Sequence, residues 1–250
     1  MKKKVLFVGE SCFVETTEYK GYDQFSGIRY NEHAGEMKAV FDPVKFEFHH
    51  IPCHLVPTCF PRTLDSLREY DVIIFSDVGA DTFLLIPEMV RTGKRVPNLL
   101  KLVQQYVADG GGFAMIGGYM SFQGIQARAR YKGSPIEELL PVLMLQGDDR
   151  KEIPEGADLV CQPDSHPILE GMPAQWPYVL GYNQLTAKEG VDVLVSFEGD
   201  PVISAWGYGK GRSVAYAVDC AAHWAPAAMT EWPFYKRLWN NIAAWLAGII

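Results

Sequence analysis

The most constraining feature of this sequence is the glycine-rich stretch from Gly110 to Gly124, GGGFAMIGGYMSFQG. Its first glycines end a preceding helix, and the apolar run Phe113–Ile116 has the length of a buried strand. Gly117 and Gly118 can adopt backbone conformations that a Cβ atom disfavours, so we predict a sharp turn from this strand into a following helix. Such turns lie at the carboxyl edge of open α/β sheets, where free backbone N–H groups suit an anion. The alternative is a packing turn that binds no ligand.

The rest of the first half alternates strand-like and helix-like segments, which is typical of a parallel sheet covered by helices on both faces. Val5–Val8 and the run from Asp71 to Asp77 are apolar enough to be buried strands, and Val44–Pro52 alternates like an edge strand. Residues Tyr19–Tyr30 are rich in Gly, Tyr and polar side chains and predict a long loop over the carboxyl edge. The expected helices run from Asn31 to Phe41, from Thr63 to Tyr70 and from Pro97 to Asp109.

The second half is less regular but predicts more strands of the same sheet. Many Pro, Gly and acidic residues between positions 127 and 180 indicate irregular insertions rather than a second domain. The segments VDVLVSFEG, VISAWGYG and GRSVAYAVD predict successive strands joined by tight turns, and thus a β-hairpin. A final helix is expected to start near Thr230. We therefore predict a single α/β domain over residues 1–250.

Composition excludes several classes of function. The formal net charge is -7 and there is no basic stripe, so we expect neither nucleic acid nor a membrane surface as a partner. Lys2, Lys3 and Lys4 precede an apolar run too short for a signal peptide, and no run reaches membrane-spanning length. The odd count of five cysteines fits reduced thiols. We expect a cytoplasmic protein.

Polar side chains that follow the strands are the candidates for a site, because the carboxyl ends of parallel strands meet at one edge. The catalytic candidates are Glu10, His223 and Cys220, and the ligand-binding candidates are Ser11, Asp77, Gly117, Gly118, Tyr119 and Asp219. An imidazole at His223 could act as an acid, a base or a hydrogen-bond donor near neutral pH. The alternatives are a solvated loop acid at Glu10, a helix cap at Asp77 and a structural histidine at His223.

The cysteines allow two further hypotheses. Cys220 ends a predicted strand three residues before His223, so the two could form a thiolate pair if the loop folds back. A lone cysteine is more often an inert core residue. Cys53, His54 and Cys59 lie within seven residues, but a structural zinc site needs four ligands and no fourth is nearby. We therefore predict no metal and no cofactor, and the role of these three residues stays open.

Several stretches together resemble a known family, and they follow one another over nearly the whole chain. They are VLFVGES, DVIIFSD, GGGFAMIGGYMSF, DSHPILEGMP and AWGYGKGRSVAYAVD, followed by an aromatic final helix. In order and spacing they resemble the ThuA-like branch of the class I glutamine amidotransferase-like superfamily. The resemblance implies a flavodoxin-like three-layer α/β sandwich with a mostly parallel central sheet and a β-hairpin extension. It also implies one pocket formed by the glycine turn, the loop after the first strand and a late loop that carries His223.

The same resemblance argues against glutaminase chemistry. Amidotransferases of this superfamily place a Cys nucleophile in the turn and a His-x-Glu motif late in the chain, but here Gly117 stands in the turn. The late segment DCAAHW offers His223 without a Glu two residues later. Glycine supplies no nucleophile, so we expect no thioester at Gly117.

Two classes of function remain after these arguments. One is an enzyme that acts on a small molecule through Glu10 and His223, or through Cys220 and His223. The other, slightly favoured, is a binding or assembly module that keeps the fold without the chemistry. The aromatic residues Tyr119, Tyr182, Trp206, Tyr208 and Trp224 could form a stacking wall for a sugar-like ligand. They could equally bury a subunit interface, and we expect a homo-oligomer.

Overall fold

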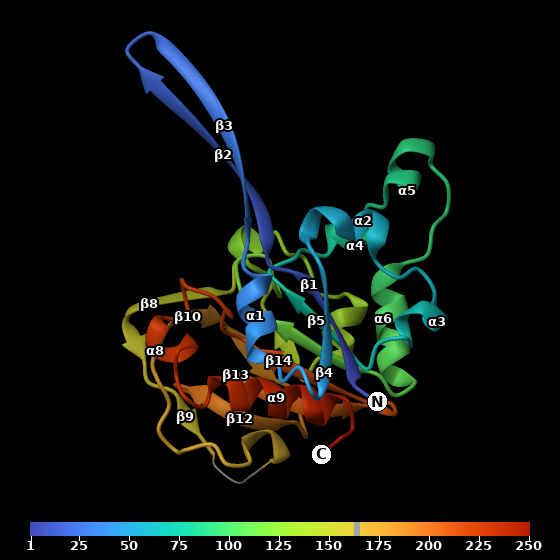
Figure 1. Cartoon of the computed structure of the whole chain (residues 1–250), viewed down its shortest axis with the longest axis vertical. Helices are drawn as coiled ribbons and strands as arrows, with labels where there is room; N and C mark the ends of the chain where they lie inside the picture. The colour runs from blue at the N-terminus through green and yellow to red at the C-terminus, as the bar shows by residue number, and fades with distance from the viewer. Residues whose placement is uncertain (163–165) are drawn as a thin grey trace.

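The computed structural model describes residues 1–162 and 166–250, and an eight-stranded sheet forms its centre (Figure 1). The strand order is β4-β1-β5-β6-β14-β13-β12-β9; the first five strands are parallel and the last three are antiparallel to their neighbours. Their bounds are β1 Lys3–Gly9, β4 Phe46–Ile51, β5 Val72–Ser76, β6 Gly112–Ile116, β9 Val160–Cys161, β12 Asp192–Phe197, β13 Asp200–Tyr208 and β14 Gly211–Tyr216. The α/β fold, the mostly parallel sheet and the late hairpin are confirmed.

Helices cover both faces of the sheet, as the side-chain register requires. In β6, a Cβ on Gly112 would meet Leu246 of α9, whereas the next residue, Phe113, points to the other face and packs on Phe75. Tyr216 shares the face of Gly112 and packs on Trp239 of α9. The helices are α1 Ala34–Val40, α2 Val56–Cys59, α3 Leu64–Leu67, α4 Asp81–Leu84, α5 Pro87–Thr92, α6 Leu99–Ala108, α7 Pro135–Leu139, α8 Ala227–Thr230 and α9 Tyr235–Leu246. None of those within the described residues is long and apolar enough to cross a membrane.

The insertions between positions 127 and 180 form two small antiparallel sheets beside the main one. Strands β8 (Arg150–Ala157) and β10 (Val179–Asn183) make one pair, and β7 (Val142–Met144) and β11 (Leu185–Ala187) make the other. Residues 163–165, where the motif DSHPILEGMP begins, lie outside the described residues. The aromatic side chains of the final third mostly pack within the subunit; the buried ones include Tyr216, Trp224, Tyr235 and Trp239.

The predicted loop over Tyr19–Tyr30 is wrong. Strands β2 (Ser11–Lys20) and β3 (Asp23–Glu32) form a hairpin that stands away from the body of the molecule, and every residue of β3 is exposed (Figure 1). The turn at Gly21 has a left-handed φ of 67°, which suits glycine. The Thr, Tyr, Phe and Val residues of these strands favour extended structure, but no alternation toward a core marks them. We call this hairpin the arm.

The structure also differs from the sequence prediction at two helix boundaries and at the helix expected after the glycine turn. Helix α1 starts at Ala34 because Asn31 pairs with Cys12 inside the arm, and α9 starts at Tyr235 rather than near Thr230. After β6 the chain makes bends and a single 3-10 turn, η2 (Ile125–Ala127), instead of entering a helix. The glycine stretch is therefore a strand end followed by a compact loop.

Stability should depend on the aromatic core beneath β5. Phe75 is buried and its ring stacks on Phe83 at a centroid distance of 4.3 Å. We expect Phe75→Ala to lower the free energy of unfolding by about 3–5 kcal/mol, because it removes contacts and leaves a cavity. Urea denaturation measures the change. The matched control is Tyr22→Ala at the exposed tip of the arm, which should cost less than about 0.5 kcal/mol; equal losses would contradict this core.

Candidate active site at the carboxyl edge of the sheet

Three acidic side chains meet at the carboxyl edge of the sheet. Glu10 follows β1, Asp77 follows β5 and Asp219 lies just beyond β14. In the sheet, β6 lies between β5 and β14. The negative charge of Asp77 acts on Glu10, and the charges of both act on Asp219, so the three groups are electrostatic neighbours. We call Glu10, Asp77 and Asp219 the carboxyl cluster. The sheet topology brings these three candidates together as the sequence predicted.

Backbone strain marks two members of the cluster. Glu10 has a φ of 52° and Asp77 a φ of 45°, so two neighbouring strands end in left-handed residues that are not glycine. The N–H of Glu10 donates to the carbonyl of Ser76 at 2.9 Å, which ties the two strand ends together. A left-handed non-glycine residue costs about 1–2 kcal/mol, and such residues concentrate at functional sites.

Glu10 is buried against a serine and a thiol. The Ser76 hydroxyl donates to Glu10 Oε2 at 2.5 Å, and the Cys220 Sγ lies 3.5 Å from the same oxygen. Burial, and then the charge of Asp77, raises the pKa of Glu10. Burial also raises the pKa of Cys220 well above its usual value, so this cysteine is a protonated thiol near neutral pH.

The other two acids also retain protons more readily than usual. Burial raises the pKa of Asp77, although the Met120 N–H donates to its Oδ1 at 2.6 Å. Burial and the charge of Glu10 raise the pKa of Asp219 to about 8. Close carboxyl groups disfavour one another's ionisation, so the cluster retains protons to a higher pH than isolated carboxyl groups do.

The glycine turn beside the cluster is packed, which contradicts the prediction of free backbone donors. The Gly117 N–H donates to the Tyr216 carbonyl at 2.7 Å, and the Gly118 N–H donates to Asn183 Oδ1 at 2.9 Å. A Cβ on Gly117 would lie 2.2 Å from the Ala217 carbonyl oxygen. On Gly118, which has a φ of 144°, a Cβ would lie 2.8 Å from Asp77 Oδ1. Neither position has room for a side chain.

Two buried residues that were not among the predicted site residues stabilise this turn through hydrogen bonds. Asn183 Nδ2 donates to the Gly118 carbonyl at 3.2 Å and to Asp149 Oδ1 at 2.8 Å. Asp149 also accepts hydrogen bonds from the N–H groups of Gln123 and Gly124. A polar residue ending the apolar run VLGYN was the available signal for Asn183.

Outside the cluster, Tyr119, Glu152 and His223 form an outer rim. The Tyr119 hydroxyl donates to Glu152 Oε1 at 3.0 Å and lies 3.3 Å from His223 Nε2. The charge of His223 opposes the burial-driven rise in the pKa of Asp77, so the rim adjoins the cluster. His223 contacts Tyr119 and Glu152 in this rim. Cys220 instead contacts Glu10 and Ser76 inside the cluster. The structure does not pair the thiol with the imidazole.

The proposed wall of five aromatic residues does not form. Tyr119 lies near Trp224, with ring centroids 5.7 Å apart, but Trp224 and Tyr182 are buried. Trp206 and Tyr208 pair with residues at the start of β14, at the opposite end of the sheet. Tyr119 and His223 are therefore the accessible rings at the site.

Potential metal ligands converge inside the cluster. Among the described residues, Glu10, Asp219 and Cys220 place one ligand atom each within 4.8 Å of one another, whereas Cys53, His54 and Cys59 form no such group. A cation there would have to displace the protons that these groups retain.

Ser11 accepts a hydrogen bond from the Cys53 N–H at 2.8 Å and lines a cavity of about 470 Å³ at the root of the arm.

Comparison with known proteins agrees with this architecture. A family model described as "Putative glutamine amidotransferase" matches residues 4–248. The chain belongs to this family. Two solved structures are similar to it: the cytoplasmic proteins STM1381 of Salmonella typhimurium LT2 and STM3548 of Salmonella typhimurium. They are 39% and 40% identical, each with a TM-score of 0.92, and the matches cover 97% of this chain and 99% and 98% of theirs.

A more distant structure shares the fold of this glutamine amidotransferase-like chain. It is a "Putative thua-like protein" from Bacteroides uniformis ATCC 8492, 13% identical with a TM-score of 0.58, covering 98% of this chain and 91% of that one. At this identity the likeness concerns the fold alone. A comparison with curated proteins found no match.

The packing of the turn predicts that a nucleophile cannot be restored by one substitution. We expect Gly117→Cys to lower the melting temperature by several degrees, since its Cβ would clash with the Ala217 carbonyl. It should release no ammonia from glutamine. Gly147→Cys, where a Cβ meets nothing within 4 Å, is the matched control for stability. A stable Gly117→Cys variant with glutaminase activity would contradict this geometry.

The raised pKa of Asp219 predicts a dependence of stability on pH. From its ordinary pKa of 3.8 to about 8, the folded state binds a proton that the unfolded state lacks, so this contribution to stability falls as pH rises through that window. Asp219→Asn lacks the effect. Relative to the parent, its melting temperature should rise by several degrees from pH 5 to pH 9, as measured by calorimetry. Asp23→Asn, which removes one carboxyl group from an exposed position on the arm, is the control, and a flat difference for Asp219→Asn would refute the assignment.

Proposed function

We propose that this glutamine amidotransferase-like protein binds a small polyhydroxylated molecule, of which a sugar is the favoured class, and has no glutaminase activity. The observation that carries the proposal is the convergence of Glu10, Asp77 and Asp219 around a glycine turn with no room for a nucleophile. Strained backbone at two of these residues supports a role in binding rather than in folding.

The protonation of the cluster favours a ligand rich in hydroxyl groups. Carboxyl groups that share protons can both donate and accept hydrogen bonds, as neighbouring sugar hydroxyls also do. An anionic ligand would be repelled by any ionised member of the cluster. The outer rim adds the Tyr119 and His223 rings and the Glu152 carboxylate, a combination of flat and polar surfaces that suits a sugar ring.

A second candidate function is hydrolysis of a small molecule. The observation that favours it is the pKa of Asp219 near 8 beside Glu10, because a carboxyl group that is protonated at neutral pH can act as a general acid. His223 would then be a base or a hydrogen-bond donor at the rim. Turnover of a ligand found by binding would support this candidate over simple binding.

Two broader assignments complete the proposal. We assign the chain to the ThuA-like branch of the family on its sequence motifs, with the fold of the Bacteroides uniformis protein in agreement. We also assign it to the cytoplasm, which agrees with the description of the two similar Salmonella proteins as cytoplasmic. Fractionation of the native cells would test the second assignment.

Ligand binding tests the site directly. Thermal-shift screening of sugars, sugar alcohols, amino acids and polyamines should identify a sugar or sugar alcohol. Calorimetric titration of that compound should show binding about tenfold weaker, or worse, in Glu10→Gln and in His223→Ala, because each change removes a hydrogen bond at the site.

Glu18→Gln on the arm is the matched control for Glu10→Gln and should bind like the parent. If both site variants bind the compound as tightly as the parent, the site is misplaced. If only polyamines raise the melting temperature, the cluster binds cations and the polyhydroxylated class is wrong.

A further inference from the structure

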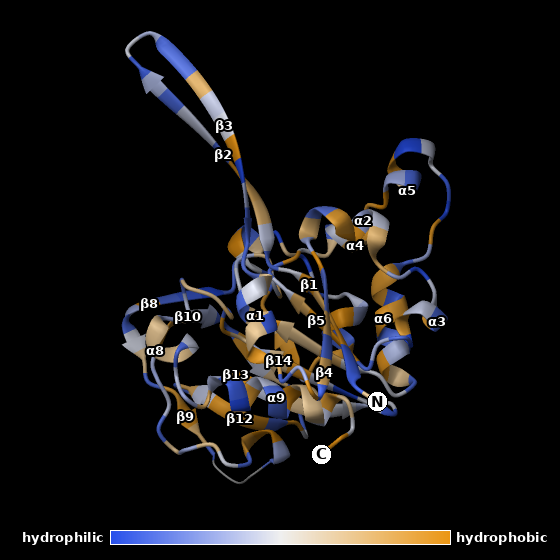
Figure 2. Cartoon of the chain, in the orientation of Figure 1, coloured by the Kyte–Doolittle hydropathy of each residue, from blue (hydrophilic) through white to orange (hydrophobic). Residues whose placement is uncertain are grey.

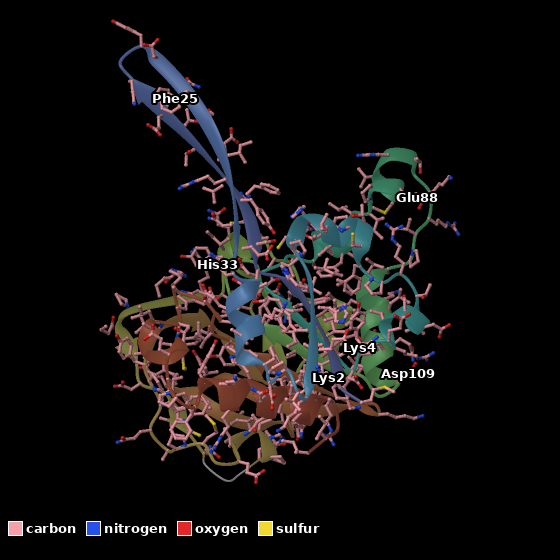
Figure 3. All side chains as sticks on the ribbon, in the orientation of Figure 1. Lys2, Lys4, Phe25, His33, Glu88 and Asp109 are labelled. Carbon is pink, nitrogen blue, oxygen red and sulfur yellow. The ribbon has the colours of Figure 1, made fainter. Side chains whose placement is uncertain are left out.

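The arm exposes apolar side chains that the subunit itself does not cover. Six large ones lie on it, namely Phe13, Tyr19, Tyr22, Phe25, Ile28 and Tyr30. Figure 2 shows hydrophobic segments along the arm, and Figure 3 shows Phe25 far out on it, away from His33 at its root. A two-stranded hairpin is only marginally stable in water, so an arm of ten-residue strands needs a covering surface.

The register of the hairpin sorts these side chains onto two faces. Phe13 pairs with Tyr30, and Glu15 with Ile28, and both pairs lie on one face with Tyr19 nearer the tip. This face, which we call the aromatic face, exposes 58% of Phe13, 73% of Tyr19 and 70% of Ile28. The opposite face is more polar and carries Phe25.

The aromatic face leads into the cavity at the root of the arm. Phe13 and Tyr30 both pack edge-on against His54, at centroid distances of 5.2 and 5.3 Å. Beside them lies the cavity of about 470 Å³, whose lining includes Ser11, Cys53 and Leu85. Cys53 Sγ lies 3.6 Å from the Asp77 carbonyl oxygen, so the cavity adjoins the carboxyl cluster.

The aromatic face is complementary to itself under a two-fold rotation. Rings occupy both of its ends, at Phe13 and Tyr30 near the root and at Tyr19 near the tip, and the hydrogen-bonded hydroxyls of Thr17 and Ser26 lie between them. Two arms packed antiparallel would place Tyr19 of each on the root rings of the other. A two-fold interface has this property, since one patch meets its own copy.

We propose that two copies of this chain exchange arms through the aromatic face, so that Tyr19 of each copy closes the root cavity of the other. Each strand is ~30 Å long, enough to span from root to tip of an antiparallel partner. Its exposed aromatic and aliphatic side chains present on the order of 500 Å² per subunit, a large share of the ~800 Å² per partner of a standard interface. The partner's Tyr19 thus adds a wall beside Ser11 and the carboxyl cluster.

Light scattering tests the assembly. The parent should have twice the subunit mass of 28.0 kDa, and the variant Tyr19→Ser with Ile28→Ser should have the mass of one subunit. Both positions are exposed, so the variant should keep the far-ultraviolet circular dichroism and the melting cooperativity of a folded subunit. Phe25→Ser on the opposite face is the matched control and should keep the parent's mass. If the parent forms an assembly larger than a dimer, the proposal is supported when the double variant has half the parent's mass.

Cross-linking tests the contact itself. In a background of Cys12→Ser and Cys59→Ser, which removes the exposed cysteines, Tyr19→Cys with Leu85→Cys should form disulfide-linked dimers under mild oxidation. Phe25→Cys with Leu85→Cys should not. A parent that stays monomeric, a double variant with the parent's mass, or equal cross-linking of the two cysteine pairs would overturn the proposal. These outcomes are independent of any ligand, so they do not bear on the proposed function.

Discussion

The close approach of two backbones at Gly117 and Ala217 is the constraint on which the site depends. Strands β6 and β14 run parallel, and their hydrogen bonding continues past β6 where the Gly117 N–H donates to the Tyr216 carbonyl. The Ala217 carbonyl lies so near that only glycine fits at position 117. Asp219 and Cys220 follow Ala217 by two and three residues, so they lie just beyond this contact. The packing that leaves no room for a side chain at Gly117 therefore occurs directly before the segment that places Asp219 in the cluster.

The carboxyl cluster gathers acidic groups at an edge of the sheet where the glycine turn has no room for a side chain. Three strand ends supply acids, and burial at this edge raises the pKa of each; the charge of Asp77 adds to the rise at Glu10, and the charges of Glu10 and Asp77 add to it at Asp219. Asn183 accepts a hydrogen bond from the Gly118 N–H, and Asp149 accepts hydrogen bonds from the N–H groups of Gln123 and Gly124, so these three donors are not free to bind an oxyanion. The titratable groups that meet at this edge are therefore carboxyl groups, a nearby imidazole and a buried thiol whose pKa is raised by burial.

The sequence predicted the parts of the fold that depend on burial. The apolar runs of β1, β5 and β6 and the stripe of α6 gave correct elements, and the parallel topology then placed Glu10, Asp77 and Asp219 at one edge. The arm could not be predicted in this way, because no face of it packs on the core and its strands carry no burial pattern. The roles of Asn183 and Asp149 were hidden for another reason. Their partners lie in the glycine loop, far away in sequence, and only the folded chain brings them together.

The position of the arm in the chain links it mechanically to the site. β2 begins at Ser11, directly after Glu10, and the returning strand ends where the His33 N–H donates to the Glu10 carbonyl. Both strands of the arm, each ~30 Å long, are therefore attached to the body of the molecule at Glu10. A displacement of ~5 Å at the tip corresponds to a rotation of only about 10° at Glu10, given that strand length. A force applied at the tip is therefore transmitted to the backbone of the residue whose buried carboxyl group lies against Ser76 at the edge of the sheet.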